Sequence, residues 1–413
     1  MNFLYNLVIH IYGRLIAIAS CFGAKAKKRH VGSHNVWNIL KEKADKNSKY
    51  IWFHASSLGE FEQGLPLMEK VKSENPQTKI LLTFFSPSGY EVRKNHKIAD
   101  IICYLPTDTK HNAQKFLSLV NIEKAIFIKY EFWGNFLTEL KKREIPTYLI
   151  SAIFRKEQVF FKIYGGFYRK ILKCFTHIFV QDENSRKLLK SVDVFRVTVA
   201  GDTRFDRVNT IAKQSKNLNL IEKFADKQAV IVAGSTWAAD EDLLLKYFNE
   251  NENIKLIIAP HEIHESHILE IIGKLKRPYL RYSQLTDDNV ENIDCVIIDC
   301  FGILSSIYRY GKIAYIGGGF GAGIHNTLEA AVYAIPVVWG TNYMKFREAR
   351  ELIACGEGFS ISNYETLKNV LDNLLVNSKI DEKVGNYVKS NLGATKLIFE
   401  EIFNNKDVKN ISA

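Results

Sequence analysis

Short apolar runs alternate with longer amphipathic segments along most of this chain. The apolar runs of the first half are residues 50–56, 79–85, 101–106, 125–130, 146–152 and 176–181, and those of the second half are residues 228–235, 254–260, 295–299, 313–319 and 335–340. Between them lie segments such as residues 61–75, in which apolar residues recur at helical spacing. Short apolar strands separated by amphipathic helices predict parallel sheets with helices on both faces.

A polar stretch over residues 207–226 contains no apolar run and divides this alternation into two halves of similar size. We therefore predict an α/β protein with two Rossmann-like domains, over residues 31–206 and 227–413, joined by this linker. A helix is expected over residues 380–402. Ligands of such folds bind beyond the carboxyl ends of the strands, and two domains place the expected site in the cleft between them.

Residues 1–30 combine an apolar segment with a basic end. Residues 3–23 are mostly apolar but include His10 and Arg14, and a basic cluster follows at residues 25–30. A secretory signal has the opposite order, so we predict a membrane-anchoring segment whose basic end, like the rest of the chain, faces the cytoplasm. Arg14 makes a transmembrane span costly. A helix lying in the membrane interface fits as well, and a helix packed on the domain is the remaining alternative.

Positive charge is concentrated in the first half. The chain of 413 residues has a net charge of +11, whereas residues 1–206 carry 33 Lys and Arg against 19 Asp and Glu, and residues 207–413 carry 23 against 26. This asymmetry predicts an anionic partner for the first half (nucleic acid, a membrane surface or a phosphorylated substrate), unless it only keeps the surface soluble. No nucleic-acid-binding signature supports the first partner. Six cysteines without a Cys-x-x-Cys pair indicate reduced thiols.

Polar residues follow the first two apolar runs. Ser56 and Ser57 come directly after the first run, and Glu60 lies at the start of the next expected helix. The helix dipole favours an ionised carboxylate there, which either accepts a proton from a substrate or only stabilises the first turn. Ser88 and Gly89 follow the second run in a loop that suits hydroxyl or phosphate contacts, or serves as a helix cap.

Three further residues of the first half have the chemistry of a binding site. Glu131 follows an apolar run two residues before Trp133, so it either binds a sugar or orients a second carboxylate, or it is a solvated residue beside a core tryptophan. Arg155 and Arg204 could each clamp a carboxylate or phosphate with two hydrogen bonds, or form surface ion pairs.

In the second half, Ser235 and Thr236 end one apolar run and His261 follows another. His261 is predicted to contact a phosphate or a base, or to be a surface histidine. The spacing to His264 is not the His-Glu-x-x-His spacing that places two zinc ligands one turn apart, so zinc is disfavoured.

The strongest local signal is the glycine run at residues 317–323, which follows a strand and precedes a helix expected from about His325. Glycines let the backbone approach a ligand, and a helix N-terminus attracts an anion. A dinucleotide is disfavoured, because the run follows a late strand and lacks the required acidic residue downstream. Glu329, one turn after Asn326, could accept both hydroxyls of a ribose or be a structural helix residue.

Together these residues and their neighbours resemble one family, the 3-deoxy-D-manno-octulosonic acid (Kdo) transferases that act on lipid A. The matching motifs are His54-Ala55-Ser56-Ser57-Leu58-Gly59-Glu60, Tyr104-Leu105-Pro106 with Asp108, Glu131-Phe132-Trp133 with Asn135, Gly201-Asp202-Thr203-Arg204-Phe205-Asp206, and the glycine run through His325-Asn326 to Glu329. The order and spacing of the motifs are specific, although no single motif is. The chain departs from the family pattern at Lys129, Gly134 and Arg204, where Glu, Pro and Lys are usual.

The resemblance implies a B-type glycosyltransferase fold, anchored N-terminally at the cytoplasmic face of the inner membrane. The implied donor is CMP-Kdo, bound by residues 227–413, and the implied acceptor is a phosphorylated lipid A precursor, bound by residues 31–206. Glu60 would be the general base, Glu131 the second catalytic carboxylate, and Arg204 would replace the family's lysine. We expect substrate contacts from Ser56, Ser57, Ser88, Gly89, Arg155, Ser235, Thr236, His261, Gly318, Gly319, Gly321, Asn326 and Glu329.

The implied reaction is attack of an acceptor hydroxyl on the anomeric carbon of Kdo with inversion. Cytidine monophosphate leaves as an anion, which helix N-termini and a basic residue can stabilise. No Asp-x-Asp stretch stands in a matching loop, so we predict transfer without a metal or other cofactor. Two alternatives remain: another B-type glycosyltransferase that uses a uridine nucleotide sugar, and a catalytically inactive membrane-bound nucleotide-sugar sensor, against which the retained Glu60 counts.

Overall fold

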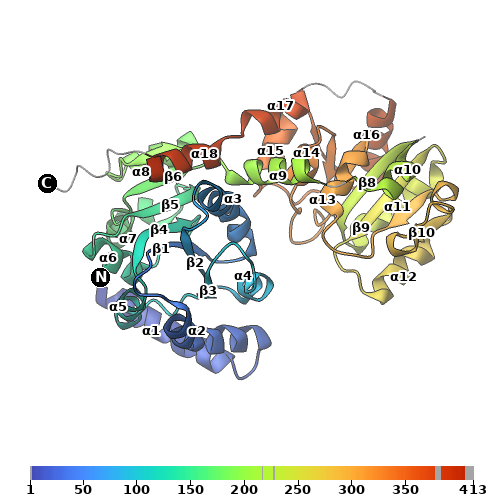
Figure 1. Ribbon diagram of the computed structural model, residues 1–413. Coiled ribbons are helices and arrows are strands. Elements are labelled where there is room, and N and C mark those ends of the chain that lie inside the picture. The colour runs from blue at the N-terminus through green and yellow to red at the C-terminus, as the bar shows by residue number, and fades with distance from the viewer. Residues whose placement is uncertain (1, 216, 227, 377–382, 405–413) are drawn as a thin grey trace. The chain divides into compact units, whose positions relative to one another are not determined.

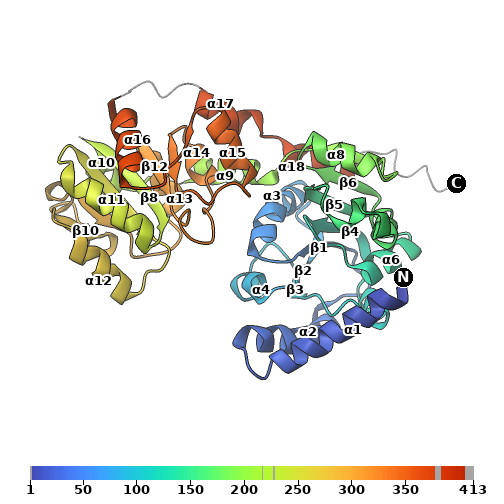
Figure 2. The same ribbon diagram turned by 180° about the vertical axis from the view of Figure 1, so that it is seen from behind.

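The chain forms two compact units, each built around one parallel sheet (Figure 1; Figure 2). The computed structural model describes residues 2–215, 217–226, 228–376 and 383–404. The first unit contains the chain up to Arg207 together with the segment that begins at Leu392, and the second unit runs from Val208 to Asn391. The prediction of two parallel-sheet α/β domains is confirmed.

The first unit holds a seven-stranded sheet with the order β3-β2-β1-β4-β5-β6-β7, in which every pair of neighbours is parallel. Its strands are β1 (Tyr50–Ala55), β2 (Lys79–Phe84), β3 (Ile101–Tyr104), β4 (Ile122–Ile128), β5 (Thr147–Ala152), β6 (His177–Val180) and β7 (Val197–Val199). Its helices are α1 (Asn2–Ala19), α2 (Ala24–Lys43), α3 (Leu58–Glu74), α4 (Pro87–Arg93), α5 (Lys110–Leu119), α6 (Gly134–Lys142), α7 (Gly166–Leu172), α8 (Glu183–Lys190) and α18 (Ala394–Phe399), and α9 (Thr203–Gln214) crosses into the second unit.

Helices cover both faces of this sheet, which is why its strands are continuous apolar runs. Successive side chains of β1 enter opposite cores. Trp52 packs with Phe116 of α5 in one core, whereas Phe53 shares the other core with Phe61 and Leu65 of α3. Because every side chain of β1 is buried, the polar groups that follow the strand are held by a rigid central element.

The second unit repeats this architecture with the strand order β10-β11-β9-β8-β12-β13-β14, again parallel throughout. Its strands are β8 (Ala229–Thr236), β9 (Ile254–Pro260), β10 (Tyr279–Arg281), β11 (Cys295–Ile297), β12 (Ile313–Ile316), β13 (Val337–Trp339) and β14 (Gly358–Ser360). Its further helices are α10 (Asn219–Ala225), α11 (Ala238–Glu250), α12 (Glu265–Lys274), α13 (Leu304–Ile307), α14 (Leu328–Ala331), α15 (Arg347–Ala354), α16 (Tyr364–Val376) and α17 (Lys383–Ser390).

Each apolar run that predicted a strand contains one, and three strands were missed. The missed strands β7, β10 and β14 have three residues each and lie at the edges of the two sheets. An edge strand has one neighbour instead of two and is less covered, so it does not require a long apolar run. The described residues of the segment 207–226 contain no strand, as predicted, and they include the end of α9 and all of α10.

The end of the described chain corrects the predicted domain boundary at residue 413. Residues 380–382 of the expected helix at residues 380–402 lie outside the described part of the chain. The remainder is interrupted at Gly393, which has φ +105°, and α18 then packs on the first unit. Its side chains Ile398 and Phe399 enter the same core as α3. The carboxylate of Asp206 accepts hydrogen bonds from the N–H groups of Gly393 and Thr395, at 2.8 and 2.7 Å. Burial of these apolar side chains returns the segment to the first unit.

Helix α1 is fastened to the first unit by polar contacts of its inner side. Tyr5 donates to Oδ2 of Asp108 at 2.5 Å and accepts a hydrogen bond from the N–H of Gly134 at 3.0 Å, and Asn135 donates to Asn6 at 2.9 Å. A proline at position 134, which the resemblance predicts, has no N–H to donate to Tyr5. Burial raises the pKa of Asp108 to about 6, against the lowering effect of Tyr5 and of two backbone N–H groups.

The membrane anchor predicted for residues 1–30 is not confirmed by the fold. Of the helices that the structure describes, none combines the length and the apolar character that a bilayer crossing requires.

Replacing Tyr5 by Phe is expected to loosen α1. The ring can still pack on Phe167, at 5.0 Å between centroids, but Asp108 and the N–H of Gly134 each lose a buried partner. We expect a loss of about 1–3 kcal/mol in the unfolding free energy of the first unit, measured by urea denaturation, and faster protease cleavage within α1. The Tyr12→Phe variant, altered at a 40% exposed side chain, is the control. Equal effects of both variants would contradict this attachment.

Candidate active site

The loops after β1 and β2 form one continuous edge at the carboxyl ends of these strands. The N–H of Ser86 donates to the carbonyl of Ser56 at 2.7 Å, and the N–H of Phe85 donates to that of Ala55 at 3.3 Å. Ser56 and Ser57, both half-buried, are therefore held beside the second loop. This edge is the expected location of a ligand in a parallel sheet.

Glu60 lies in the first turn of α3, at this edge. Ser57 occupies the N-cap position, and its hydroxyl contacts Oε2 of Glu60. The carboxylate is half-buried, and the N-terminal end of the helix dipole favours its ionised form. An ionised carboxylate in this position can accept a proton from a group bound at the strand ends.

Ser88 and Gly89 have different surroundings from each other. The side chain of Ser88 is exposed, while its N–H caps α4 by donating to Oγ of Ser86 at 3.3 Å. Gly89 is buried, and a Cβ there would lie 2.4 Å from the ring of Phe84 and 3.0 Å from the backbone of Ser57. Gly89 therefore allows close packing, and the exposed hydroxyl of Ser88 lies 3.0 Å from Oγ of Ser86.

Glu131 is buried and its carboxylate is fixed by two side chains. Oε2 of Glu131 lies 2.9 Å from Nε2 of His54, and it accepts the indole N–H of Trp133 at 2.6 Å. On the other side of His54, Nδ1 lies 2.8 Å from the hydroxyl of Thr83, which accepts the indole N–H of Trp52 at 2.8 Å. We call these five residues the Glu131 network.

The contacts of the Glu131 network fit more than one arrangement of protons, since Nε1 of Trp133 also lies 3.0 Å from Nε2 of His54 and Nδ1 of His54 lies 3.2 Å from the carbonyl oxygen of Thr83. One arrangement runs from Trp52 to Glu131. Because Trp52 donates to the hydroxyl of Thr83, that hydroxyl can donate its own proton to Nδ1 of His54. In this arrangement Nε2–H of His54 donates to Oε2 of Glu131, which also accepts the indole N–H of Trp133. The network joins β1, β2 and the loop after β4, and it orients Glu131 rather than leaving it solvated as a surface residue.

Three of the predicted site residues lie close enough to Tyr130 to influence the pKa of its phenol. Burial raises the pKa of its phenol, and nearby charges act in both directions. The guanidinium groups of Arg155 and Arg204 lower this pKa, whereas the carboxylate of Glu60 raises it. Glu60, Arg155 and Arg204 therefore lie within electrostatic range of one phenol. Sequence reasoning missed Tyr130, although it directly precedes Glu131 at the end of a strand.

Arg204 is held by a neighbouring carboxylate. Its Nε and Nη2 lie 2.9 and 2.8 Å from Oδ2 of Asp202, and its backbone N–H donates to Oδ1 at 2.9 Å. Burial alone would raise the pKa of Asp202, but the charge and hydrogen bonds of Arg204 outweigh this effect and the pKa is lowered. Asp202 thus fixes the guanidinium of Arg204 in the neighbourhood of Tyr130, which Glu60 also influences.

In the second unit, the glycine run follows strand β12 as predicted, but the helix after the run begins later than predicted. The prediction of a helix from about His325 is wrong, because α14 starts at Leu328 and has only four residues. The N–H of His325 donates back to the carbonyl of Gly317 at 3.2 Å, which keeps the intervening residues out of a helix. A helix dipole therefore does not support anion binding at this position.

The glycine run is pinned by a buried carboxylate that sequence reasoning missed. Asp240 accepts the N–H of Gly318 at 2.9 Å and the hydroxyl of Tyr315 at 2.8 Å. Gly318 has φ +89°, and a Cβ on Gly319 would lie 2.5 Å from the nitrogen of Gly340. Gly321 donates its N–H to Gly318 at 3.0 Å, so part of the run closes on itself.

Ser235 and Thr236 differ in accessibility at the end of β8. Ser235 adopts φ +54°, an unusual conformation for a residue with a side chain. Thr236 is fully buried, and its hydroxyl donates to Glu241 at 2.9 Å, which also contacts Nε2 of His267 at 3.0 Å. The hydroxyl of Thr236 is therefore committed to α11, while Ser235 marks a strained turn at the strand end.

Three flat rings stack at the carboxyl ends of β8 and β9. The ring of His261 lies 4.6 Å from that of Trp237 and 4.5 Å from that of His325, with interplanar angles of 27° and 30°. Burial and the neighbouring His261 lower the pKa of His325. Trp237 is 41% exposed and was not predicted, although it follows a strand end directly. Such a stack suits a planar ligand.

Asn326 and Glu329, predicted as a ribose-binding pair, contact each other. Nδ2 of Asn326 donates to Oε1 of Glu329 at 3.0 Å, and Oδ1 of Asn326 accepts the N–H of Leu328 at 3.2 Å. Asn326 thus orients the carboxylate of Glu329 while it starts the short helix α14.

Comparison with solved structures shows the fold that this chain shares with other proteins. UDP-GlcNAc 2-epimerase from Neisseria meningitidis, solved with bound UDP-GlcNAc, superposes with a TM-score of 0.61 over 86% of this chain and 100% of its own, at 16% sequence identity. At this identity the likeness shows the fold alone. The two parallel-sheet domains are those of B-type glycosyltransferases and their structural relatives.

Comparison with sequences then identifies the family. Residues 28–207 match the model described as 3-Deoxy-D-manno-octulosonic-acid transferase (kdotransferase). The chain is 31% identical to the 3-deoxy-D-manno-octulosonic acid transferase of Aquifex aeolicus, over 82% of this chain and 90% of that protein. It is 26% identical to the protein of the same name from Rickettsia bellii, over 90% of both. The chain belongs to the Kdo transferase family, and it is a glycosyltransferase.

The Glu131 network predicts the effect of removing a single donor. The Trp133→Phe variant keeps a ring that can pack on Phe85, at 4.7 Å in the parent, but it removes the N–H that Glu131 accepts. Because that acceptor is buried, we expect a loss of about 1–3 kcal/mol in unfolding free energy, measured by chemical denaturation. Trp37→Phe, at a partly buried tryptophan outside the network, is the matched control. Equal losses in both variants would show that the hydrogen bond contributes nothing.

Proposed function

We propose that this protein transfers Kdo from CMP-Kdo to a hydroxyl of a phosphorylated lipid A precursor, with Glu60 as the general base. The observation that carries the proposal is family membership across most of the chain, joined to the position of Glu60 at a strand-end edge. The relatives from Aquifex aeolicus and Rickettsia bellii are both named 3-deoxy-D-manno-octulosonic acid transferase.

The first unit supplies the groups for activating an acceptor. Glu60 takes the proton of the acceptor hydroxyl as the oxygen bonds to the anomeric carbon of Kdo, and the bond from that carbon to the phosphate of cytidine monophosphate breaks. The electron pair leaves with the phosphate, and the configuration inverts. Arg204, held by Asp202, and Arg155 provide positive charge near Glu60 for the carboxylate or phosphate groups of the substrates.

The second unit supplies a surface for the donor nucleotide. The stacked rings of Trp237, His261 and His325 suit a nucleobase, and the glycine run next to them allows a close backbone approach. Glu329, oriented by Asn326, is an acceptor for ribose hydroxyls. A uridine nucleotide sugar would use the same features, so the donor has to be tested directly.

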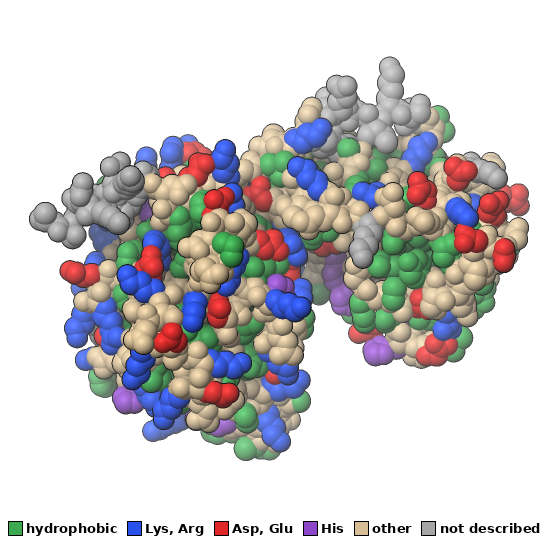
Figure 3. Space-filling view, viewed as in Figure 1, with side chains coloured by type: hydrophobic (Ala, Val, Ile, Leu, Met, Phe, Trp, Pro, Cys, Tyr) green, Lys and Arg blue, Asp and Glu red, His purple; other side chains and the backbone are tan. Residues whose placement is uncertain are grey.

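Helix α1 supports a place at the membrane surface. One side of this helix carries exposed apolar side chains at helical spacing. They are Phe3, Leu4, Leu7, Val8, Ile11, Leu15 and Ile18. We call this the apolar face of α1. Such a face binds the interfacial region of a bilayer, and the basic residues at 25–29 and the excess of Lys and Arg over the first unit favour anionic lipids (Figure 3). We propose that α1 lies in the interface at the cytoplasmic face of the inner membrane.

The Glu60→Gln variant tests the general base. Purified protein, CMP-Kdo and a lipid A precursor are incubated, and products are read by mass spectrometry. We expect transfer to fall at least about 100-fold in this variant, because the amide cannot accept the proton, while its circular dichroism and thermal midpoint stay those of the parent. Glu62→Gln, two residues along α3 and paired with Arg93 and Arg207, is the control. Transfer by Glu60→Gln at the parent rate would exclude Glu60 as the base.

The same assay separates the alternative functions. Addition of a sugar from a uridine donor but not from CMP-Kdo would replace the proposal with a different B-type glycosyltransferase. Binding of either donor without any turnover in the parent protein would favour a nucleotide-sugar sensor.

Membrane attachment through α1 is tested by vesicle flotation. The Ile11→Glu variant places a charge in the apolar face of α1, and we expect its partitioning onto vesicles with anionic phospholipid to fall at least about tenfold. Val92→Glu, at an exposed position on α4, is the control. Binding should also weaken as salt concentration rises, because the basic residues are screened. Equal flotation of both variants would contradict the proposed interface.

A further inference from the structure

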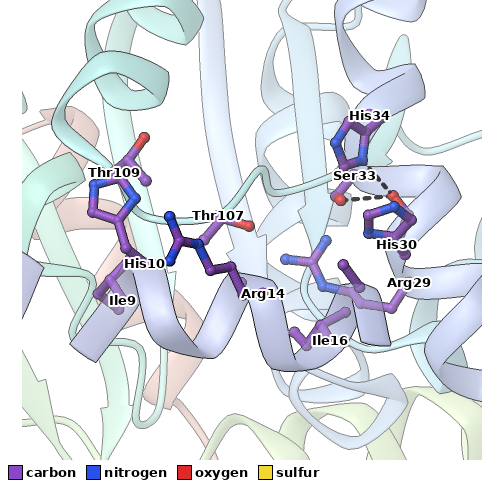
Figure 4. A pocket seen from close by; sticks show the side chains of 12 residues that line it. Ile9, His10, Arg14, Ile16, Arg29, His30, Ser33, His34, Thr107 and Thr109 are labelled. Atoms are coloured by element: carbon purple, nitrogen blue, oxygen red, sulfur yellow. Dashed lines mark hydrogen bonds between the residues drawn. The ribbon is translucent and has the colours of Figure 1, made fainter. Parts of the chain in front are cut away.

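A pocket of about 300 Å³ lies between α1 and α2, next to the loop that follows β3 (Figure 4). The polar side chains around it are predominantly basic or imidazole groups. They include His10, Arg14, Arg29, His30, His34 and Thr107. The residues that line the pocket include no carboxylate. A positively charged pocket without a compensating acid is suited to an anion.

Arg29 is the most informative residue of this pocket. Its side chain is 5% exposed, and neither Nε nor Nη1 has a hydrogen-bond partner among the residues that the structure describes. The guanidinium lies over the ring of Phe85, at 4.4 Å, and 5.5 Å from the centre of the ring of Tyr104. Aromatic faces hold the cation in place but leave its N–H groups unsatisfied. Burial lowers its pKa to about 10, so Arg29 stays charged at neutral pH.

The carboxylates near the pocket are engaged elsewhere. Asp108 follows Thr107, but its oxygens accept hydrogen bonds from Tyr5 and from the N–H groups of Asn135 and Phe136. Glu91 lies 3.2 Å from Nζ of Lys94 and 4.0 Å from that of Lys28. Neither acid accepts a hydrogen bond from Nε or Nη1 of Arg29. These two nitrogens can therefore donate to an acceptor on a bound ligand.

The surroundings indicate which anion fits. Arg14 projects from α1, which also presents Ile11, Leu15 and Ile18 to solvent. A ligand with a phosphate group and hydrocarbon chains could place the phosphate between Arg14 and Arg29 while its chains follow the apolar face of α1. A guanidinium fork binds two phosphate oxygens at once. A free phosphate would gain only the polar half of these contacts.

We infer that this pocket binds the phosphate group of an amphiphilic lipid, with Arg29 and Arg14 as its principal ligands. The phosphate can belong to an anionic phospholipid or to a phosphorylated lipid acceptor, since both present the same chemistry. The site goes beyond the proposed transfer reaction, because lipid binding here requires no donor sugar.

The test is calorimetric titration of the full-length protein with dihexanoyl phosphatidic acid, kept below its micelle concentration and without donor. The comparison ligands are dihexanoylglycerol, which lacks the phosphate, inorganic phosphate, which lacks the chains, and a lipid A precursor with and without its phosphates. The variants are Arg14→Gln at an exposed position, Arg29→Lys, which keeps the charge but loses the fork, and Lys27→Gln as a control of equal charge loss outside the pocket.

We expect Kd for dihexanoyl phosphatidic acid to rise at least about tenfold in Arg14→Gln and Arg29→Lys and to change less than about twofold in Lys27→Gln. Dihexanoylglycerol should not bind, and inorganic phosphate should bind at least about tenfold more weakly. A matching loss for the phosphorylated lipid A precursor would add the acceptor as a source of the phosphate, and an effect limited to phosphatidic acid would assign the site to phospholipid. Equal Kd values in the Arg14, Arg29 and Lys27 variants, or binding that ignores the phosphate, would overturn the inference. Because no donor is present, this result is independent of whether the protein transfers Kdo.

Discussion

His54 and Glu131 meet at 2.9 Å in the interior of the first unit, and the geometry of its functional edge depends on this contact. A buried carboxylate is costly unless hydrogen-bond donors reach its oxygens. The ends of β1 and β2, which carry His54 and Thr83, and the loop after β4, which carries Glu131, therefore have to keep fixed positions relative to one another. The register of β1 with β2 pairs His54 with Thr83 directly. The network therefore fixes the end of β1, which leads through Ser57 into the first turn of α3 with Glu60, and the proposed base can act only from a fixed position.

A second polar cluster connects this edge to the proposed membrane face. Tyr5 of α1 reaches Asp108 and Gly134, and Gly134 begins the helix that follows Trp133. The ring of Phe85 contacts both Trp133 and the guanidinium of Arg29. Phe85 thus connects the lipid-phosphate pocket with the Glu131 network within the first unit. A lipid acceptor held at that pocket would be held on the same body as the proposed base.

Much of this was predictable from local pattern. Buried parallel strands have to be apolar on both faces, so their positions are visible in the sequence, and groups after them converge at one edge. The position of Glu60 at this edge was predicted for this reason. The helix after the glycine run was predicted wrongly, because the hydrogen bond from His325 back to Gly317 is a tertiary closure that spacing does not reveal. Trp237 and Asp240 were missed because their roles come from neighbours on other strands.

The sequence by itself determined the positions of the strands other than β7, β10 and β14, the α/β class with two units, the concentration of positive charge in the first half and the family. Only the tertiary structure decided that α18 returns to the first unit and that Glu131 is bound by His54 and Trp133. It also decided that Nε and Nη1 of Arg29 are buried without a hydrogen-bond partner among the described residues. The physical reason is that periodicity records which side of an element is buried. It does not record which distant residue lies opposite, and burial, charge pairing and unsatisfied donors depend on that distant residue.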